Sequence, residues 1–164
     1  MEKQSDKEKS VEIKKESIIQ EQMSIGVEET QILTVLGSSV AVTLHDREKK
    51  IGGMVHFLQP IWDGIGFKTL RYGNIATQRL IDTLLEKGSK RENLEAKIIG
   101  GADMNPDSSH RKVSIGLRNV GVAKEILDEN SIKIIAEDIG KELGRFVVFN
   151  SHSGKVDIRY SSKK

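Results

Sequence analysis

Two neighbouring hydroxyl side chains and a histidine are the groups in this sequence best suited to chemistry. Ser38 and Ser39 follow Gly37, and glycine there permits a tight turn that exposes a nucleophile and points backbone N–H groups at an oxyanion. A serine nucleophile needs a base to accept its proton, and His56 is a candidate for that role. The structural alternatives are a plain turn serine and a histidine that belongs to a core or rim, and both are common in proteins.

The elements that must position these groups are two apolar runs. Residues 40–44 and 51–58 are apolar, and residues 46–50 between them are charged, which predicts two strands joined by an exposed turn. Side chains alternate between the faces of a strand, so His56 shares a face with Met54. A hydroxyl at the mouth of one strand can then meet a histidine on the paired strand.

The same stretch resembles a known family. LGSSVAVTLHD followed by GGMVHFLQP is similar to the signature of the chemoreceptor glutamine deamidases, the CheD family. The likeness continues in order through YGNIATQRLIDTLLEKGSKRENLEAKIIGGADM, IGLRNV and AEDIGKELGRFVVFNSHSGKVDIR, and so covers about residues 25–160. Ser39 stands where the family has its nucleophilic cysteine, and His56 stands at the family's base in the motif G-G-M-x-H.

The resemblance implies an activity and a set of site residues. The activity is hydrolysis of specific glutamine side chains in the cytoplasmic part of a chemoreceptor, with release of ammonia. A family threonine corresponds to Thr34, with Leu33 as the alternative register. The implied catalytic residues are Ser39, His56 and Thr34, and the candidate substrate contacts are Gly37, Ser38 and Gly53. Family members also bind the CheC phosphatase, which is a second implied partner.

Serine at position 39 leaves the activity open. A cysteine has a pKa of about 8.5 and can wait as a thiolate, whereas a serine must lose its proton during attack. The chain is therefore an active deamidase that works with serine, a cysteine enzyme whose nucleophile has been replaced by serine, or a catalytically silent member that binds chemoreceptors or CheC. An unrelated amidase or esterase with a hydroxyl nucleophile is a third hypothesis, but the sequence has no G-x-S-x-G motif.

Composition excludes several classes of function. With 30% charged residues, 37% hydrophobic residues and a net charge of +2, the chain is typical of an ordinary soluble protein and carries too little charge to indicate nucleic-acid binding. The absence of cysteine excludes disulfides and thiolate metal sites, and the four histidines lack a metal-ligand spacing, so we expect no metal and no cofactor. No apolar stretch is long enough for a signal sequence or a membrane span, which predicts a cytoplasmic location without membrane insertion.

The chain divides into a short extension and one domain. Residues 1–22 are dense in charged and polar residues and are expected to be a flexible extension, or alternatively a solvated amphipathic helix. Residues 23–164 form a single domain of α+β class. Its expected fold is a layered sandwich of mixed, partly antiparallel sheets, with two main helices packed on one side as the resemblance implies. The helices are expected near residues 74–87, with Asn74 as N-cap, and 117–130, and His45 is expected to be exposed.

Overall fold

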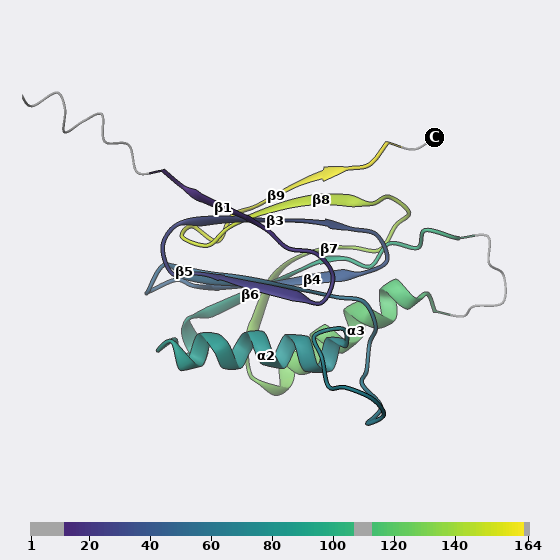
Figure 1. Ribbon diagram of the computed structural model, residues 1–164, viewed down its shortest axis with the longest axis horizontal. Helices are drawn as coiled ribbons and strands as arrows, with labels where there is room; N and C mark the ends of the chain where they lie inside the picture. Colours follow the sequence, from purple (N-terminus) through teal and green to yellow (C-terminus); the bar gives the residue numbers. More distant parts are fainter. Residues whose placement is uncertain (1–11, 107–112, 163–164) are drawn as a thin grey trace, which may run out of the picture.

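The computed structural model describes residues 12–106 and 113–162, which form a sandwich of two β-sheets (Figure 1). The first sheet has four strands in the order β1 (Lys14–Ser17), β3 (Thr30–Leu36), β8 (Arg145–Asn150) and β9 (Val156–Tyr160). The second has five strands in the order β2 (Gln22–Gly26), β5 (Ile51–Phe57), β4 (Val40–Asp46), β6 (Leu94–Gly100) and β7 (Lys133–Ile139). Each sheet contains one parallel pair, β1 with β3 and β6 with β7, and is otherwise antiparallel.

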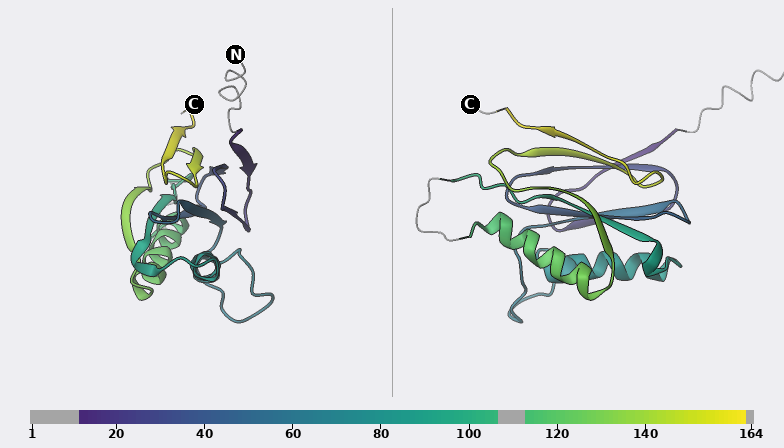
Figure 2. Two further views of the ribbon diagram at one scale, coloured as in Figure 1. Left: turned by 90° about the vertical axis from the view of Figure 1, so that its left-hand side faces the viewer. Right: turned by 180° about the vertical axis from the view of Figure 1, so that it is seen from behind.

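Both long helices cover one face of the five-stranded sheet. Helix α2 (Gly73–Glu86) and helix α3 (Ile115–Glu129) lie side by side on the face away from the four-stranded sheet, as Figures 1 and 2 show, and a 3-10 turn η1 (Arg91–Asn93) leads into β6. The prediction of an α+β sandwich of mixed sheets with both helices on one side is therefore confirmed. None of the helices in the described ranges is long and apolar enough to cross a membrane.

The inner strands β4 and β5 of the five-stranded sheet are buried on both faces, which explains their unbroken apolar runs. Every residue of β4 and β5 is buried, because the helices cover one face and the four-stranded sheet covers the other. The alternation within these strands divides their side chains between two cores. Val42, Val55 and Leu80 lie in the core against the helices, and Ile32, Ala41 and Met54 lie in the core between the sheets.

Three local expectations differ from the structure. Tyr72 rather than Asn74 is the N-cap of α2, and the Asn74 side chain instead accepts a hydrogen bond from the backbone N–H of Trp62 at 3.0 Å. His45 is buried rather than exposed, because its Nε2 lies 2.7 Å from the carbonyl oxygen of His152 in the turn between β8 and β9. Within the expected extension, residues 14–17 form the edge strand β1, while residues 1–11 lie outside the described residues.

Candidate active site

Three elements bring a serine, a histidine and a threonine together at one end of the sandwich. Thr34 belongs to β3 in the four-stranded sheet, His56 belongs to β5 in the facing sheet, and Ser39 lies in the turn that carries the chain from one sheet to the other. His56 Nε2 lies 2.7 Å from Ser39 Oγ, and His56 Nδ1 lies 2.8 Å from Thr34 Oγ1. The three side chains predicted from the sequence as catalytic therefore form one continuous hydrogen-bonded chain.

A backbone carbonyl at the other end of this chain determines which histidine nitrogen carries the proton. Thr34 Oγ1 donates its only hydrogen to the carbonyl oxygen of Ile18, 2.9 Å away. Thr34 Oγ1 must then accept a hydrogen bond from Nδ1–H of His56. In the neutral imidazole this leaves a lone pair on Nε2, which accepts the hydrogen bond from Ser39. The hydrogen-bonded chain therefore prepares His56 to act as a base towards Ser39.

Burial keeps His56 neutral near physiological pH. The side chain is 1% exposed and points into the core between the sheets, and burial alone lowers its pKa from the ordinary value of 6.5 to about 4. Thr34 and Ser39 are also buried, so the whole chain of hydrogen bonds is shielded from water. A neutral imidazole at pH 7 is the form that can accept a proton.

The lowered pKa of His56 predicts a pH-dependent loss of stability. Between about pH 6.5 and pH 4 the unfolded chain takes up a proton on this histidine while the folded chain does not. The free energy of unfolding should therefore fall by up to about 3 kcal/mol as the pH drops through this window. Urea unfolding of the native protein and of His56→Gln at several pH values measures this term as the difference between their slopes. Equal slopes for the two proteins would contradict it.

The candidate substrate contacts are only partly brought to this site. Gly37 and Ser38 are half-buried beside Ser39 in the turn between β3 and β4, and their position is compatible with contact to a substrate. Gly53 lies on the opposite face of β5 from His56, where an added Cβ would lie 3.0 Å from Leu80 Cδ1 of α2. The structure therefore does not place Gly53 with the catalytic candidates.

A cavity of about 470 Å³ opens beside the histidine. It is lined by the turn between β1 and β2, by residues 33–35 of β3, and by His56 and Phe146. Val35 and Phe146 face each other across the β3–β8 pair and are well exposed, so the mouth of the cavity is apolar. The cavity therefore gives apolar groups access to the Nδ1 edge of the His56 ring, which contacts Thr34.

The segment after β6 holds the Ser39 turn in place, and no expectation from the sequence included this contact. The backbone N–H of Gly101 donates to the carbonyl oxygen of Ser39 at 2.9 Å, and that of Ala102 donates to the carbonyl oxygen of Gly37 at 3.0 Å. Gly100 has a φ of +112°, and an added Cβ there would lie 2.5 Å from the Ser39 carbonyl oxygen. The glycine pair at 100–101 is the sequence signal for this close approach.

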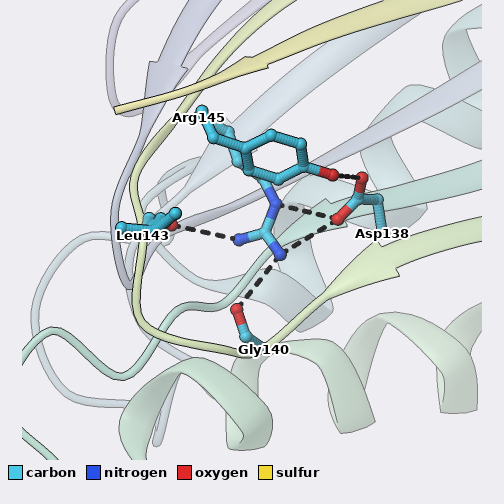
Figure 3. A network of polar contacts seen from close by, with 5 residues as sticks. Asp138, Gly140, Leu143 and Arg145 are labelled. Carbon is cyan, nitrogen blue, oxygen red and sulfur yellow. Dashed lines mark hydrogen bonds and ion pairs between the residues drawn. The ribbon is translucent and has the colours of Figure 1, made fainter. Parts of the chain in front are cut away.

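A buried arginine holds the turn between β7 and β8, which in turn contacts the end of β6 (Figure 3). Arg145 is 1% exposed, and its guanidinium donates to Asp138 Oδ1 from Nε at 3.1 Å and to the carbonyl oxygen of Gly140 from Nη2 at 3.1 Å. The backbone N–H of Gly140 donates in turn to the carbonyl oxygen of Gly100 at 2.9 Å. The Tyr160 hydroxyl also donates to Asp138, and this bond raises the pKa of Tyr160. The arginine therefore supports the Ser39 turn through two intervening backbone contacts.

The described residues contain no cluster of side chains suited to a metal ion. Within residues 12–106 and 113–162, no three His, Asp or Glu side chains are grouped so that they could hold a metal ion. The chain contains no cysteine.

The chain is similar to one family of known proteins. The family model described as CheD chemotactic sensory transduction matches residues 64–160. A protein of Sulfurimonas denitrificans named probable chemoreceptor glutamine deamidase CheD is 39% identical over 153 residues, which cover 93% of this chain and 98% of the relative. Proteins with the same name from Trichlorobacter lovleyi and Methanosarcina barkeri are 42% and 40% identical and cover 80% and 76% of this chain, and 81% and 82% of their own lengths.

The alignment with the Sulfurimonas protein extends over the catalytic candidates. The match to the family model begins after His56, but an alignment over 93% of the chain necessarily spans residues 34–58. The alignment with the Sulfurimonas protein therefore includes Thr34, Ser39, His56 and both helices of this protein, not only its C-terminal part. The chain belongs to the CheD family.

Proposed function

We propose that this protein hydrolyses the side-chain amide of specific glutamines in the cytoplasmic part of a chemoreceptor, with Ser39 as nucleophile. The observation that carries the proposal is the contact of His56 Nε2 with Ser39 Oγ at 2.7 Å, together with that of His56 Nδ1 with Thr34 Oγ1 at 2.8 Å. Relatives named as probable chemoreceptor glutamine deamidases supply the substrate class.

The first half of the reaction forms an acyl-enzyme. Ser39 Oγ attacks the amide carbon of the glutamine side chain while its proton passes to His56 Nε2. The developing oxyanion needs hydrogen-bond donors, and the backbone N–H groups of Ser38 and Ser39 donate to no other described residue. The imidazolium then gives its proton to the nitrogen of the tetrahedral intermediate, and ammonia leaves as the C–N bond breaks.

The second half of the reaction releases the product. Water attacks the ester carbonyl while His56 Nε2 accepts one of its protons, and the same proton returns to Ser39 Oγ as the C–O bond breaks. The receptor keeps a glutamate carboxyl group where it had a glutamine amide. Thr34 takes no part in proton transfer, because its hydroxyl is used to hold Nδ1–H of His56 in place.

Two features of the site make serine a slow nucleophile here. The group behind His56 is a neutral hydroxyl, so it stabilises the imidazolium less than the carboxylate of a serine protease does. Burial of His56 adds to the cost of forming that imidazolium. A thiol at position 39 is more acidic than a hydroxyl, so a weaker base is enough to remove its proton.

These features also support a second candidate function. A protein with a weak nucleophile and an intact apolar surface could act by binding alone, with a chemoreceptor or the CheC phosphatase as its partner. The exposed Val35 and Phe146 beside the cavity offer such a partner an apolar contact. Either function places the protein in the cytoplasm, where these partners present their helical domains.

Replacement of Ser39 by cysteine separates the two functions. The native protein, Ser39→Cys and Ser39→Ala are incubated with a receptor cytoplasmic fragment, and conversion of glutamine to glutamate is followed by peptide mass spectrometry. We expect slow conversion by the native protein, a rate higher by on the order of 10²-fold for Ser39→Cys, and none for Ser39→Ala.

The outcomes of this experiment are unambiguous. Conversion by Ser39→Cys alone would assign the binding function to the native chain. If neither the native protein nor Ser39→Cys converts any glutamine, the proposed reaction is wrong for this protein.

A further inference from the structure

One buried amide on α3 joins the two backbone segments that carry the nucleophile and the base. Asn119 is fully buried, and its Nδ2 donates to the carbonyl oxygen of Ser38 at 3.2 Å and to that of Leu58 at 3.0 Å. Ser38 directly precedes Ser39, and Leu58 follows shortly after His56. Both hydrogen atoms of the amide are therefore used on the two chain segments whose separation matters for proton transfer.

The position of these two carbonyls explains why a side chain is needed there. The backbone pairing of β4 with β5 reaches Val40 and Phe57 and goes no further at this end. Ser38 and Leu58 lie just beyond that last pair, where the two strands separate into a turn and a loop. Asn119 takes the place of a further ladder hydrogen bond at the point where the ladder has ended.

Helix α3 is a rigid base for this bridge. Its first turn touches the segment after β6, where a Cβ added at Gly116 would overlap the carbonyl oxygen of Gly101. Gly101 in turn donates its N–H to the Ser39 carbonyl oxygen. The helix is thus fixed against the nucleophile turn at a second point, so Asn119 cannot shift without moving that turn.

The other end of the same amide argues against a purely structural role. Asn119 Oδ1 is buried and has no hydrogen-bond partner among the described residues. An unpaired buried carbonyl is costly, and an apolar side chain of similar size would avoid that cost. The donors are therefore the useful part of this residue.

We propose that Asn119 is a positioning residue that fixes the distance between Ser39 Oγ and His56 Nε2 by bridging the backbone of Ser38 and Leu58. This inference rests on the proposed function, because that distance matters only if Ser39 gives its proton to His56. Proton transfer requires the two atoms to stay within about 2.6–3.2 Å, and a misplacement of 1 Å can cost about 10²-fold in rate.

The test compares the same substitution at two asparagines, one within α3 and one at its C-cap. Asn119→Leu removes both donors and keeps the number and branching of the side-chain heavy atoms. Asn130→Leu is the matched control, because Asn130 at the C-cap of α3 also donates twice from Nδ2, at 2.8 Å to Gln78 Oε1 and at 2.8 Å to the Ile126 carbonyl oxygen. Asn119→Ala, which leaves a small cavity instead of an apolar group, is measured beside them in case Asn119→Leu does not fold.

Two readouts are taken. The ¹⁵N resonances of the His56 ring are titrated by NMR in the Ser39 protein, and kcat and KM for a receptor fragment are measured in the more active of the native and Ser39→Cys proteins. We expect the Asn119 variants to weaken the hydrogen bond at Nε2, to move the pKa of His56 towards its ordinary value, and to lower kcat by 10- to 100-fold at unchanged KM. Asn130→Leu should lower thermal stability without either change.

Each result has a clear meaning. His56 titration and kcat that respond equally to the substitutions at 119 and 130 would overturn the positioning role and leave a structural one. If no parent protein converts glutamine, the proposed reaction fails, but the NMR titration still decides whether Asn119 sets the geometry at Nε2. The failure of one proposal is therefore distinguishable from the failure of the other.

Discussion

His56→Ala should lower the rate of glutamine deamidation by about 10²–10⁴-fold, the range that a positioned general base or acid contributes. The loss is expected both in the native protein and in Ser39→Cys, because in the proposed reaction His56 Nε2 accepts a proton in the first step and then delivers it to the leaving nitrogen. The loss should appear in kcat, since the imidazole acts on the reacting atoms. Release of ammonia from a receptor fragment, measured under saturating substrate, gives the rate.

A second buried histidine provides the matched control for this change. His45 is 8% exposed, and its Nε2 contacts the carbonyl oxygen of His152. It lies next to the β4–β5 turn, at the opposite end of the hairpin from Ser39. His45→Ala removes the same volume from the same hairpin without touching the hydrogen-bonded chain of the site. Turnover by His56→Ala equal to that of His45→Ala would show that the base has been assigned wrongly.

Asp138→Ala should destabilise the fold by about 3–5 kcal/mol, the cost of leaving a buried charge without its partner. Asp138 is the counter-charge of Arg145, whose guanidinium lies 3.0 Å from it and is almost completely buried. The carbonyl oxygens of Gly140 and Leu143 that also accept from this guanidinium are dipoles and do not neutralise its charge. Urea unfolding followed by circular dichroism measures the change.

An exposed ion pair near the end of the chain calibrates this estimate. Lys155 and Asp157 lie 3.8 Å apart with both side chains mostly exposed, so Asp157→Ala should change stability by no more than about 1 kcal/mol. Similar unfolding midpoints for the two variants would mean that Arg145 finds solvent or another acceptor when Asp138 is removed. The buried network would then contribute little to the support of the Ser39 turn.

The parts of the site that sequence could predict are those with a side-chain signal. The alternation and the charged turn of residues 40–58 predicted the β4–β5 hairpin, and the resemblance to the CheD family supplied Ser39, His56 and Thr34 as one set of candidates. The same alternation contained the answer for Gly53. It is separated from His56 by an odd number of positions, which places the two on opposite faces of the strand.

The parts that could not be predicted depend on backbone atoms or on long-range packing. The carbonyl of Ile18 determines which ring nitrogen of His56 carries the proton. Every residue has a carbonyl, so no residue type in the sequence marks this position. Strand β1 has the sequence KKES and is exposed along its length, so it shows no apolar alternation and forms only because β3 offers a free edge. Asn119 lies within a helical pattern whose apolar positions explained the helix without it.

The contact between Thr34 and Ile18 has a practical consequence for where this domain can be cut. Ile18 lies in the turn that carries the chain from β1 to β2, before the point at which the apolar pattern of the domain becomes visible in the sequence. A shortened version that starts at residue 23 would retain Ser39, His56 and Thr34 but would release the threonine hydroxyl to turn towards the histidine. Expression boundaries for this protein are therefore better chosen from the hydrogen bonds of the first turn than from the extent of recognisable sequence.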